Sequence, residues 1–473
     1  MAESGAIFQE SAWLRRGLRY RYRIQGMSMT RRAALGVMSA ASYQRIAGAN
    51  DRVQVGFIGF GLIGAQHVHD FRNQRDCDLA AMCDVYQPRL EQGVAACGQR
   101  AKAYSDFRKL LENRELQAVV VSLPDHWHAL VTMMACAAGK DVYVEKPMTL
   151  FVREGRWMTD VARHHQRIVQ VGMQQRSGRH YQHAKQLITS GAIGKVISAR
   201  SASFRNVMPG FGNPPDGPPP SDLDYEMWLG PAPKRVYNPH RALYHFRWFW
   251  DYSGGQMTNL GAHEVDIMQW VMQQKAPSAV GSSGGRFALQ DNGETPDVQD
   301  AVFDYDGFTA EYSFREANAG RRAGAGGLEF CGTKGSLVIN RSGFEIVPDA
   351  KIPPSNAIPT FQGHPTGGPT KVAGQMEYWT QAAKEPGSSD EQFDLHVRNF
   401  LDCVKSRSIP IADVEQGHRT ATAVHLANIA LRVGRKVKWN ATTEQIVDDR
   451  EASAYLERPY RAPWDRELRS LLG

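Results

Sequence analysis

The sequence predicts an α/β protein in which a doubly wound parallel sheet is followed by a mostly antiparallel sheet. From Asp51 onward, short apolar runs alternate with helical stretches, which is the pattern of a parallel sheet with crossover helices. A glycine-rich turn joins the first apolar run to the first helix. Past Gly172 the spacing of the apolar residues changes. Longer runs in which apolar and polar residues alternate, joined by turns, indicate antiparallel strands.

The first predicted strand, residues 53–58, runs directly into a turn that matches the pattern G-x-G-x-x-G. The first glycine allows the tight turn, the second lets the backbone approach a pyrophosphate, and the third lets the helix pack closely on the strand. A diphosphate there would lie on free N–H groups at a helix N-terminus, which is an anion site without a basic side chain. The turn residues expected to contact the cofactor are Gly59, Phe60, Gly61, Leu62, Ile63 and Gly64.

The second predicted strand, residues 79–84, ends at Asp84, which lies 20 residues beyond Gly64. A carboxylate at this place can accept both ribose hydroxyls of an adenosine, and it repels a 2′-phosphate. The sequence therefore favours NAD as the cofactor. Arg89 follows closely in the sequence and keeps NADP as the less favoured alternative.

Three more strands are predicted for the parallel sheet, at residues 118–123, 141–144 and 168–171. Ligands of such sheets bind at the carboxyl ends of the strands. One end carries Pro124-Asp125-His126-Trp127-His128 and another carries Glu145-Lys146-Pro147. Lys146 would point into the crevice where a nicotinamide lies, and burial there would lower its pKa toward neutrality. A surface lysine after an edge strand is the alternative interpretation.

The second half of the chain contains the strands expected to form the antiparallel sheet, and helices near its beginning and its end. These strands are residues 196–204, 298–305, 309–314, 328–331, 336–339 and 344–347. The helices are residues 181–188, 391–405 and 421–434. A loop rich in Pro and Gly, residues 208–233, and a low-complexity loop, residues 352–370, interrupt the pattern.

A second group of polar residues lies in the glycine-flanked segment 254–270. Asn259 is expected to cap a helix, near whose start His263 could exchange protons with a substrate hydroxyl. A buried structural histidine is the alternative. The preceding aromatic run, residues 244–250, includes Arg247 and Trp248 and is consistent with a wall on which a sugar stacks, or with a core strand.

Composition excludes several classes of function. The net charge of +7 comes mostly from the first fifty residues, which hold eight Arg, no Lys and two Glu. The rest of the chain is nearly neutral, so no basic face for nucleic acid is expected. The six cysteines include no C-x-x-C pair, and no His pair combines with acids at metal-ligand spacing, so no metal is expected. The chain has no apolar run of about eighteen residues, so no membrane insertion is expected.

Residues 1–50 are expected to be a leader rather than part of a folded domain. Arg31 and Arg32, followed by an apolar stretch over residues 33–43, resemble a twin-arginine export signal. This predicts a protein exported through the twin-arginine route, for example to the periplasm. A basic tail on a cytoplasmic protein is the alternative.

These motifs together resemble the glucose–fructose oxidoreductase / inositol dehydrogenase (Gfo/Idh/MocA) family over nearly all of the chain from Asp51 onward. The resemblance implies a Rossmann domain at residues 51–172 and an α/β domain with an open, mostly antiparallel sheet at residues 173–440. A C-terminal tail, residues 441–473, follows. Members of the family often use the open sheet to assemble, so a homo-oligomer, a dimer or a tetramer, is expected.

The family chemistry is reversible oxidation of a carbinol of a sugar, polyol or glycoside, with hydride transfer to the nicotinamide of NAD(P). The resemblance implies Lys146 and His263 as the acid–base pair. Beyond the glycine turn and Asp84, it implies cofactor contacts from Pro124, Trp127, His128, Glu145, Lys146 and Gln174. It implies substrate contacts from Arg176, Tyr181, Arg247, Trp248, Asn259 and His263.

The chain departs from the family at Asn259, which stands where many dehydrogenases of the family carry Asp, four residues before His263. We therefore count Asn259 among the expected catalytic residues. This amide, the leader and the aromatic run resemble an exported branch that includes NAD-dependent glycosidases. Those enzymes oxidise a sugar carbon, eliminate the leaving group, add water and re-reduce the carbon. A sensor that binds NAD without turnover is a further alternative, against which Lys146 and His263 count.

Overall fold

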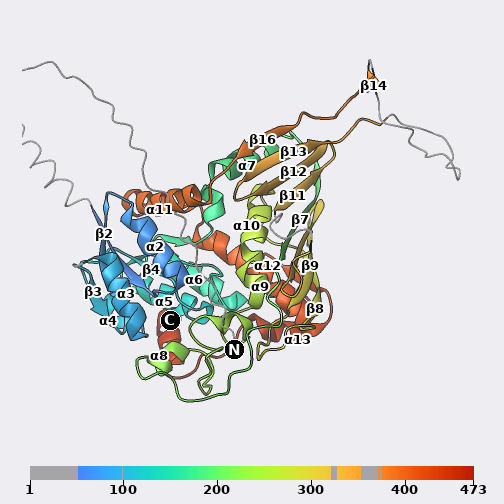
Figure 1. Ribbon diagram of the computed structural model, residues 1–473. Coiled ribbons are helices and arrows are strands. Elements are labelled where there is room, and N and C mark those ends of the chain that lie inside the picture. The colour runs from blue at the N-terminus through green and yellow to red at the C-terminus, as the bar shows by residue number, and fades with distance from the viewer. Residues whose placement is uncertain (1–51, 99, 321–326, 353–370, 373) are drawn as a thin grey trace, which may run out of the picture. The chain divides into compact units, whose positions relative to one another are not determined.

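The computed structural model describes residues 52–98, 100–320, 327–352, 371–372 and 374–473 (Figure 1). The predicted leader, with Arg31 and Arg32, lies outside the described residues. So does nearly all of the predicted low-complexity loop. Two large sheets, each flanked by helices, form most of the described part of the chain.

The first sheet has six parallel strands in the order β3-β2-β1-β4-β5-β6, so the predicted doubly wound parallel sheet is confirmed. Its strands are β1 (Val53–Ile58), β2 (Cys77–Cys83), β3 (Lys102–Tyr104), β4 (Ala118–Val121), β5 (Asp141–Val144) and β6 (Val169–Val171). The helices between them are α2 (Leu62–Arg72), α3 (Gln87–Cys97), α4 (Phe107–Leu111), α5 (Asp125–Ala137) and α6 (Val152–His164). Every residue of β4 and β5 is buried, as expected for central strands covered on both faces.

Alternate residues of β4 pack into different cores on the two faces of this sheet. Val119 and Val121 lie in a cluster with residues of α5 and α6, whereas Val120 lies in a cluster with residues of α2. A helix from the far end of the chain, α11 (Ser389–Ser406), completes the second face through Phe400. The sequence predicted this helix but not where it packs.

The second sheet has ten strands in the order β16-β13-β12-β11-β7-β10-β9-β8-β17-β18. Its pairs are antiparallel except for β7 with β10, so the predicted mostly antiparallel sheet is confirmed. The strands are β7 (Val196–Phe204), β8 (Ala279–Gly285), β9 (Val298–Tyr305), β10 (Phe308–Arg315), β11 (Leu328–Gly332), β12 (Gly335–Asn340), β13 (Gly343–Pro348), β16 (Ala383–Pro386), β17 (Val437–Asn440) and β18 (Gln445–Ile446). A separate two-stranded pair consists of β14 (Lys371–Val372) and β15 (Gln375–Met376).

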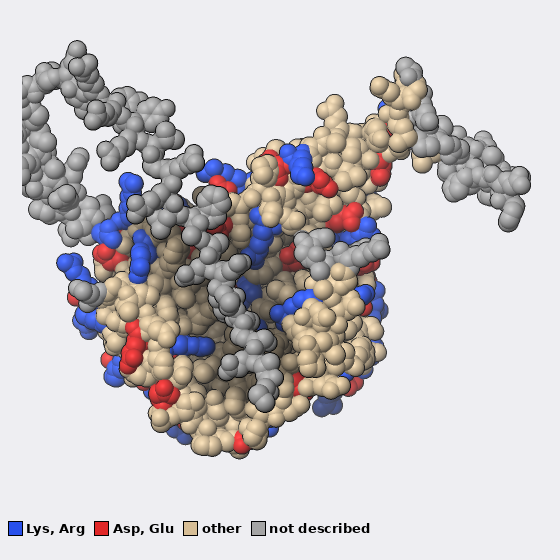
Figure 2. All heavy atoms as spheres, viewed as in Figure 1, with Lys and Arg blue, Asp and Glu red and all other residues tan. Residues whose placement is uncertain are grey.

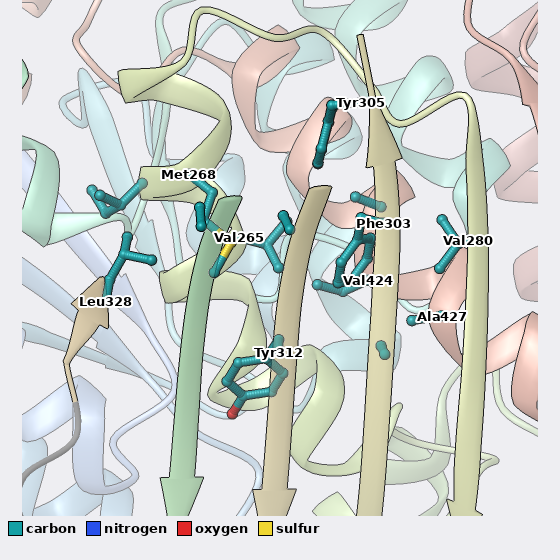
Figure 3. Packing of buried hydrophobic residues seen from close by; sticks show 14 of the residues in the cluster. Val265, Met268, Val280, Phe303, Tyr305, Tyr312, Leu328, Val424 and Ala427 are labelled. Carbon is teal, nitrogen blue, oxygen red and sulfur yellow. The ribbon is translucent and has the colours of Figure 1, made fainter. Parts of the chain in front are cut away.

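Two helices, α10 (Gly261–Val271) and α12 (Val414–Val433), cover one face of the second sheet (Figure 1). Figure 3 shows Val265 and Met268 of α10 beside Tyr312, and Val424 of α12 beside Phe303. Along β9 the buried residues alternate with exposed or half-buried ones, because successive side chains of a strand point to opposite faces. This packing fixes α10, and with it the position of His263.

The remaining helices lie in the connections and at the C-terminal end. They are α7 (Arg179–Thr189), α8 (Tyr225–Leu229), α9 (Gly255–Asn259), α13 (Arg450–Ser453) and α14 (Trp464–Leu472), with short 3-10 turns at Gln174–Ser177, His245–Trp248 and Ala454–Leu456. The aromatic run is therefore a turn rather than a strand. Trp464 of α14 packs on Trp127 with ring centroids 4.8 Å apart, so the last residues of the chain return to the first sheet.

The described residues lack two kinds of feature. No helix in the described ranges is long and apolar enough to cross a bilayer. Within the same ranges, no three His, Cys, Asp or Glu side chains converge as metal ligands would.

Candidate functional site

The glycine turn after β1 has the close backbone contacts that its pattern predicts. Gly59 has a φ of 96°, and a Cβ at this position would lie 2.4 Å from the carbonyl oxygen of Ser122. A Cβ on Gly64 would lie 2.2 Å from the carbonyl oxygen of Gly59. Helix α2 therefore begins at Leu62, directly over the strand end, and its first N–H groups are available to a ligand.

Asp84 holds this turn through its side chain. Its carboxylate accepts hydrogen bonds from the backbone N–H of Phe60, at 2.8 Å, and of Tyr86, at 2.9 Å. Phe60 thus contributes through its backbone. The carboxylate has further lone pairs that can accept from ribose hydroxyls.

An open cleft of about 860 Å³ runs along the carboxyl ends of the strands and has the character of a dinucleotide site. On one side it is lined by Gly59, Gly61, Leu62, Ile63, Asp84, Arg89, Pro124 and Trp127. On the other side it is lined by Met227, Trp228, Leu243, Tyr244, Phe246 and Arg247. The free N–H groups fit a diphosphate, and the carboxylate fits a ribose. The apolar walls fit the flat rings of the two bases. Seven of the residues predicted to contact the cofactor therefore line this cleft: Gly59, Gly61, Leu62, Ile63, Asp84, Pro124 and Trp127. Arg247, which was predicted to contact the substrate, lines it as well.

Lys146 lies two residues beyond β5, at the carboxyl end of that strand. Its Nζ donates to the backbone oxygen and to the side-chain Oδ1 of Asn259, each at 2.9 Å. Burial lowers the pKa of Lys146 to about 8, and the positive charges of Arg247 and Arg341 act in the same direction against Glu145. A lysine with this pKa can both release and accept a proton near neutrality.

Asn259 ends α9 and does not cap α10, so its expected role as a cap is wrong. Helix α10 starts two residues later, after Leu260. The physical reason is that the side chain of Asn259 is already used: its Oδ1 accepts from Lys146, and its Nδ2 donates to Gln256 at 3.0 Å.

Glu145 fixes the strand end that carries the lysine. Its Oε1 lies 2.7 Å from Nε2 of His67 and accepts from Nε2 of Gln174 at 2.9 Å. Its Oε2 accepts from the backbone N–H of Lys146 at 3.0 Å. Glu145 and Gln174 were predicted to contact the cofactor, and in the described structure both are engaged in this buried network.

His128 joins two of the loops that form the site. Its Nδ1 lies 2.7 Å from the carbonyl oxygen of Pro147, and its Nε2 lies 2.8 Å from that of Leu123. The imidazole is buried and does not line the cleft, in contrast to the predicted cofactor contact. Its neighbour Trp127 does line the cleft and donates through Nε1 to the carbonyl oxygen of Trp228 at 3.0 Å.

His263 lies on the second-sheet side of the site, close to a residue that the sequence did not indicate. Nη2 of Arg341, from the turn between β12 and β13, lies 3.5 Å from Nε2 of His263. Burial, together with the charges of Lys146 and Arg341, lowers the pKa of His263 well below its usual value. The imidazole is therefore neutral, and its Nδ1 has no hydrogen-bond partner among the described residues.

The sequence reasoning also missed a role for Asp125, the first residue of α5. Its carboxylate accepts a hydrogen bond from Ser253, and burial raises its pKa, opposed by the charges of His128, Arg247 and Lys146. Asp125 was visible in the sequence at a strand end, but only the structure indicates its electrostatic link to Lys146.

Three of the residues implied as substrate contacts have their polar atoms engaged inside the protein. Arg176 forms two hydrogen bonds of 2.7 Å with the carboxylate of Asp266. The hydroxyl of Tyr181 accepts from Gln175 at 2.9 Å, and Nε1 of Trp248 donates to Glu316 at 2.7 Å. All three side chains are buried, so the structure differs here from the expected contact with substrate.

Comparison with known proteins agrees with this geometry. The family "Oxidoreductase family, NAD-binding Rossmann fold" matches residues 53–173, and "Oxidoreductase family, C-terminal alpha/beta domain" matches residues 178–284 and 386–466. The "GFO/IDH/MocA C-terminal domain" matches residues 234–338. The chain belongs to the Gfo/Idh/MocA family. The predicted family, its fold and its NAD-binding domain are thereby confirmed.

Named relatives fall into two functional groups. Inositol 2-dehydrogenase of Salmonella paratyphi B is 25% identical over 154 residues, which are 32% of this chain and 46% of the relative. A glycosyl hydrolase family 109 protein of Shewanella sp. is 28% identical over 165 residues, which are 33% of this chain and 36% of the relative. The chain thus matches less than half the length of these curated relatives.

Solved structures extend the likeness to the whole fold. A levoglucosan dehydrogenase in complex with NADH and levoglucosan is 16% identical, with a TM-score of 0.62, and the match covers 82% of this chain and 99% of that chain. At this identity the likeness establishes the fold alone.

Proposed function

We propose that this Gfo/Idh/MocA protein is an NAD-dependent oxidoreductase that acts on a carbinol of a sugar, polyol or glycoside. The observation that carries the proposal is the position of Lys146. Its Nζ is held by two oxygens of Asn259, it is close enough to the cleft residue Arg247 to feel that charge, and its pKa is about 8. This is the arrangement of a general acid–base group.

NAD, when bound, supplies the acceptor for the hydrogen that leaves the carbinol carbon. Lys146 in its neutral form takes the proton of the substrate hydroxyl, and it returns this proton when the reaction runs backward. The oxygens of Asn259 accept the N–H groups of Lys146 and so orient the remaining lone pair. His263, which is neutral, hydrogen-bonds a neighbouring hydroxyl of the same sugar.

A redox-neutral glycoside hydrolase is the second candidate, and Asn259 is the observation that favours it. An amide beside Lys146 lacks the negative charge that an aspartate would provide, so the pKa of the lysine stays low enough for proton return within one turnover. The match to a glycosyl hydrolase family 109 protein supports this reading as well. In this reaction the oxidised carbon acidifies the adjacent C–H, the leaving group departs, water adds, and the carbon is reduced again.

One experiment separates these readings. NAD-loaded protein is mixed with a panel of sugars, polyols and glycosides while the absorbance of the nicotinamide and the release of aglycone are followed. Accumulating free NADH establishes the dehydrogenase. Many turnovers of a glycoside per NAD, with solvent deuterium at the carbon next to the oxidised one, establish the hydrolase. Bound NAD with no redox change on any compound points to a sensor.

We further propose that the protein is exported through the twin-arginine route and assembles as a dimer or tetramer. The pair Arg31 and Arg32 supports export, because paired arginines before an apolar stretch are the recognition element of that signal. Replacing both by lysine should retain the protein in the cytoplasm. Sedimentation of the purified chain measures the oligomeric state.

A further inference from the structure

Arg341 is a cation placed at the site by two separate elements of the second half. It occupies the tight turn between β12 and β13. The backbone oxygen of Arg341 accepts from Nε2 of Gln392 on α11 at 3.0 Å, and its guanidinium lies 6.0 Å from the ring centroid of Phe393. These contacts fix the direction of the side chain, which reaches Nε2 of His263.

Among the described residues the guanidinium of Arg341 forms no ion pair with an acid, although its charge opposes the burial that raises the pKa of Glu264. It has five N–H donors, and its one hydrogen-bonding approach to a side chain is the long one of 3.5 Å to the uncharged His263. The three acids around the site have other partners. Glu145 bonds His67 and Gln174, and Asp125 accepts from Ser253. Glu264 accepts its hydrogen bonds from Gln175 and Ser201, and Arg341 acts on it only through its charge.

Arg341 also adds to a local excess of positive charge. Arg341, Arg247 and Lys146 lie close enough that both arginines disfavour the charged form of the lysine. Arg247 lines the cofactor cleft, where the diphosphate of NAD is the anion to balance it. Arg341 does not line the cofactor cleft, and it approaches His263 instead. The anion that balances its charge would therefore be part of the substrate. The face seen in Figure 2 is hollowed, with Lys and Arg side chains along part of the hollow.

We propose that Arg341 binds a carboxylate of the substrate, so that the compound oxidised beside Lys146 is a sugar acid or a glycoside of one. The planar guanidinium matches a carboxylate through two parallel hydrogen bonds, and a half-buried position makes such a pair stronger than one in open water. This inference rests on the proposed function, because it names the class of substrate for the same site.

The test compares matched sugars that differ in one charge. Glucuronate, galacturonate and gluconate, each with its uncharged amide, are titrated into NAD-loaded protein by calorimetry. Each acid that binds should do so about 10- to 100-fold more tightly than its amide, which is the range for a hydrogen bond to a charged group. Sulfated and phosphorylated glucose are added to distinguish a carboxylate from a tetrahedral anion.

Three variants assign the effect to the side chain. Arg341→Gln should remove the preference for the acid over the amide while leaving the affinity for the amide within about twofold. Arg341→Lys keeps the positive charge but loses the paired N–H donors of the guanidinium, so it should retain part of the preference for the acid over the amide. Arg200→Gln is the matched control, because Arg200 is an exposed cation paired with Glu329 on β7 and β11, and it should change nothing. Thermal unfolding checks that each variant is folded.

Several results would overturn the inference. These are equal binding of every acid and its amide, a preference that survives Arg341→Gln, or tighter and Arg341-dependent binding of the sulfated or phosphorylated sugars. A distinct result concerns the proposed function alone. If the acids bind through Arg341 but neither they nor their glycosides change the absorbance of the bound nicotinamide, Arg341 is an acid-binding residue and the oxidoreductase proposal fails.

Discussion

The ammonium of Lys146 donates to the side-chain oxygen of Asn259 at 2.9 Å, a contact that a carboxylate at this position could also accept. An amide oxygen accepts the same hydrogen bond but carries no net charge. The lysine is therefore held in position without the negative charge that would raise its pKa, and burial keeps that pKa at about 8. This contact determines the expected pH dependence of the reaction.

Asn259→Asp should move the pH profile of oxidation upward. In the wild type the oxidation rate should rise with pH through about 8, because Lys146 must lose its proton before it can accept one from the substrate. A carboxylate at position 259 raises the pKa of the lysine, so the rising limb should shift by about one unit and activity at neutral pH should fall about tenfold. The pH profile of kcat/KM measures the shift. Asn440→Asp, on an exposed residue at the end of β17, should leave the profile unchanged.

Asp84→Asn should reduce the discrimination between NAD and NADP. The wild type is expected to bind NADP at least about tenfold more weakly, a difference of about 1.4 kcal/mol. The amide keeps an acceptor for only one of the backbone N–H groups of Phe60 and Tyr86, which bind different oxygens of Asp84, and it no longer repels a 2′-phosphate. Titration of both cofactors gives the ratio of dissociation constants. Equal affinities in the wild type would contradict the assigned role of Asp84.

The first sheet was largely predictable from the sequence, and the second less so. Buried parallel strands are continuous apolar runs in the sequence. The glycine turn marks the end of β1, and Asp84 marks the end of β2. Strand β8 was missed because its sequence, AVGSSGG, has little intrinsic strand preference. It is a strand because its backbone pairs with β9 on one side and β17 on the other.

Within the site, the sequence predicted residues at strand ends but not pairs that depend on tertiary packing. Lys146 and the glycine turn are placed by strands that the sequence reveals. Arg341 comes to His263 through the register of a hairpin, which no local pattern encodes. The side chain of Arg176 was expected at the substrate, yet a helix from the second half supplies Asp266 to bind it.

Arg176→Leu should destabilise the protein rather than weaken substrate binding. The guanidinium and Asp266 form a buried ion pair, so removal of one partner leaves an unpaired charge inside the protein and costs about 3–5 kcal/mol of unfolding free energy. The urea midpoint should fall clearly, and the double variant with Asp266→Leu should recover part of the loss. An unchanged midpoint together with a raised KM for the sugar would restore the substrate contact that the family resemblance implied.

Lys146→Met should abolish turnover while leaving NAD binding nearly intact. Methionine preserves most of the apolar stem but cannot move a proton, and loss of one acid–base group lowers a rate by about 10²–10⁴-fold. NAD affinity should persist, because the cofactor cleft is lined by the glycine turn, Asp84 and Trp127 rather than by the lysine. Single-turnover reduction of bound NAD measures the first effect, and calorimetry with NAD measures the second.

His263→Ala provides the comparison for this variant. Its imidazole is already neutral and 3.5 Å from Arg341, so we place it as a hydrogen-bonding partner of the substrate rather than as the main base. The rate should therefore fall less than in Lys146→Met, since water can partly replace the imidazole. If His263→Ala were the more severe of the two, with NAD binding retained in both, the roles of lysine and histidine would have to be exchanged.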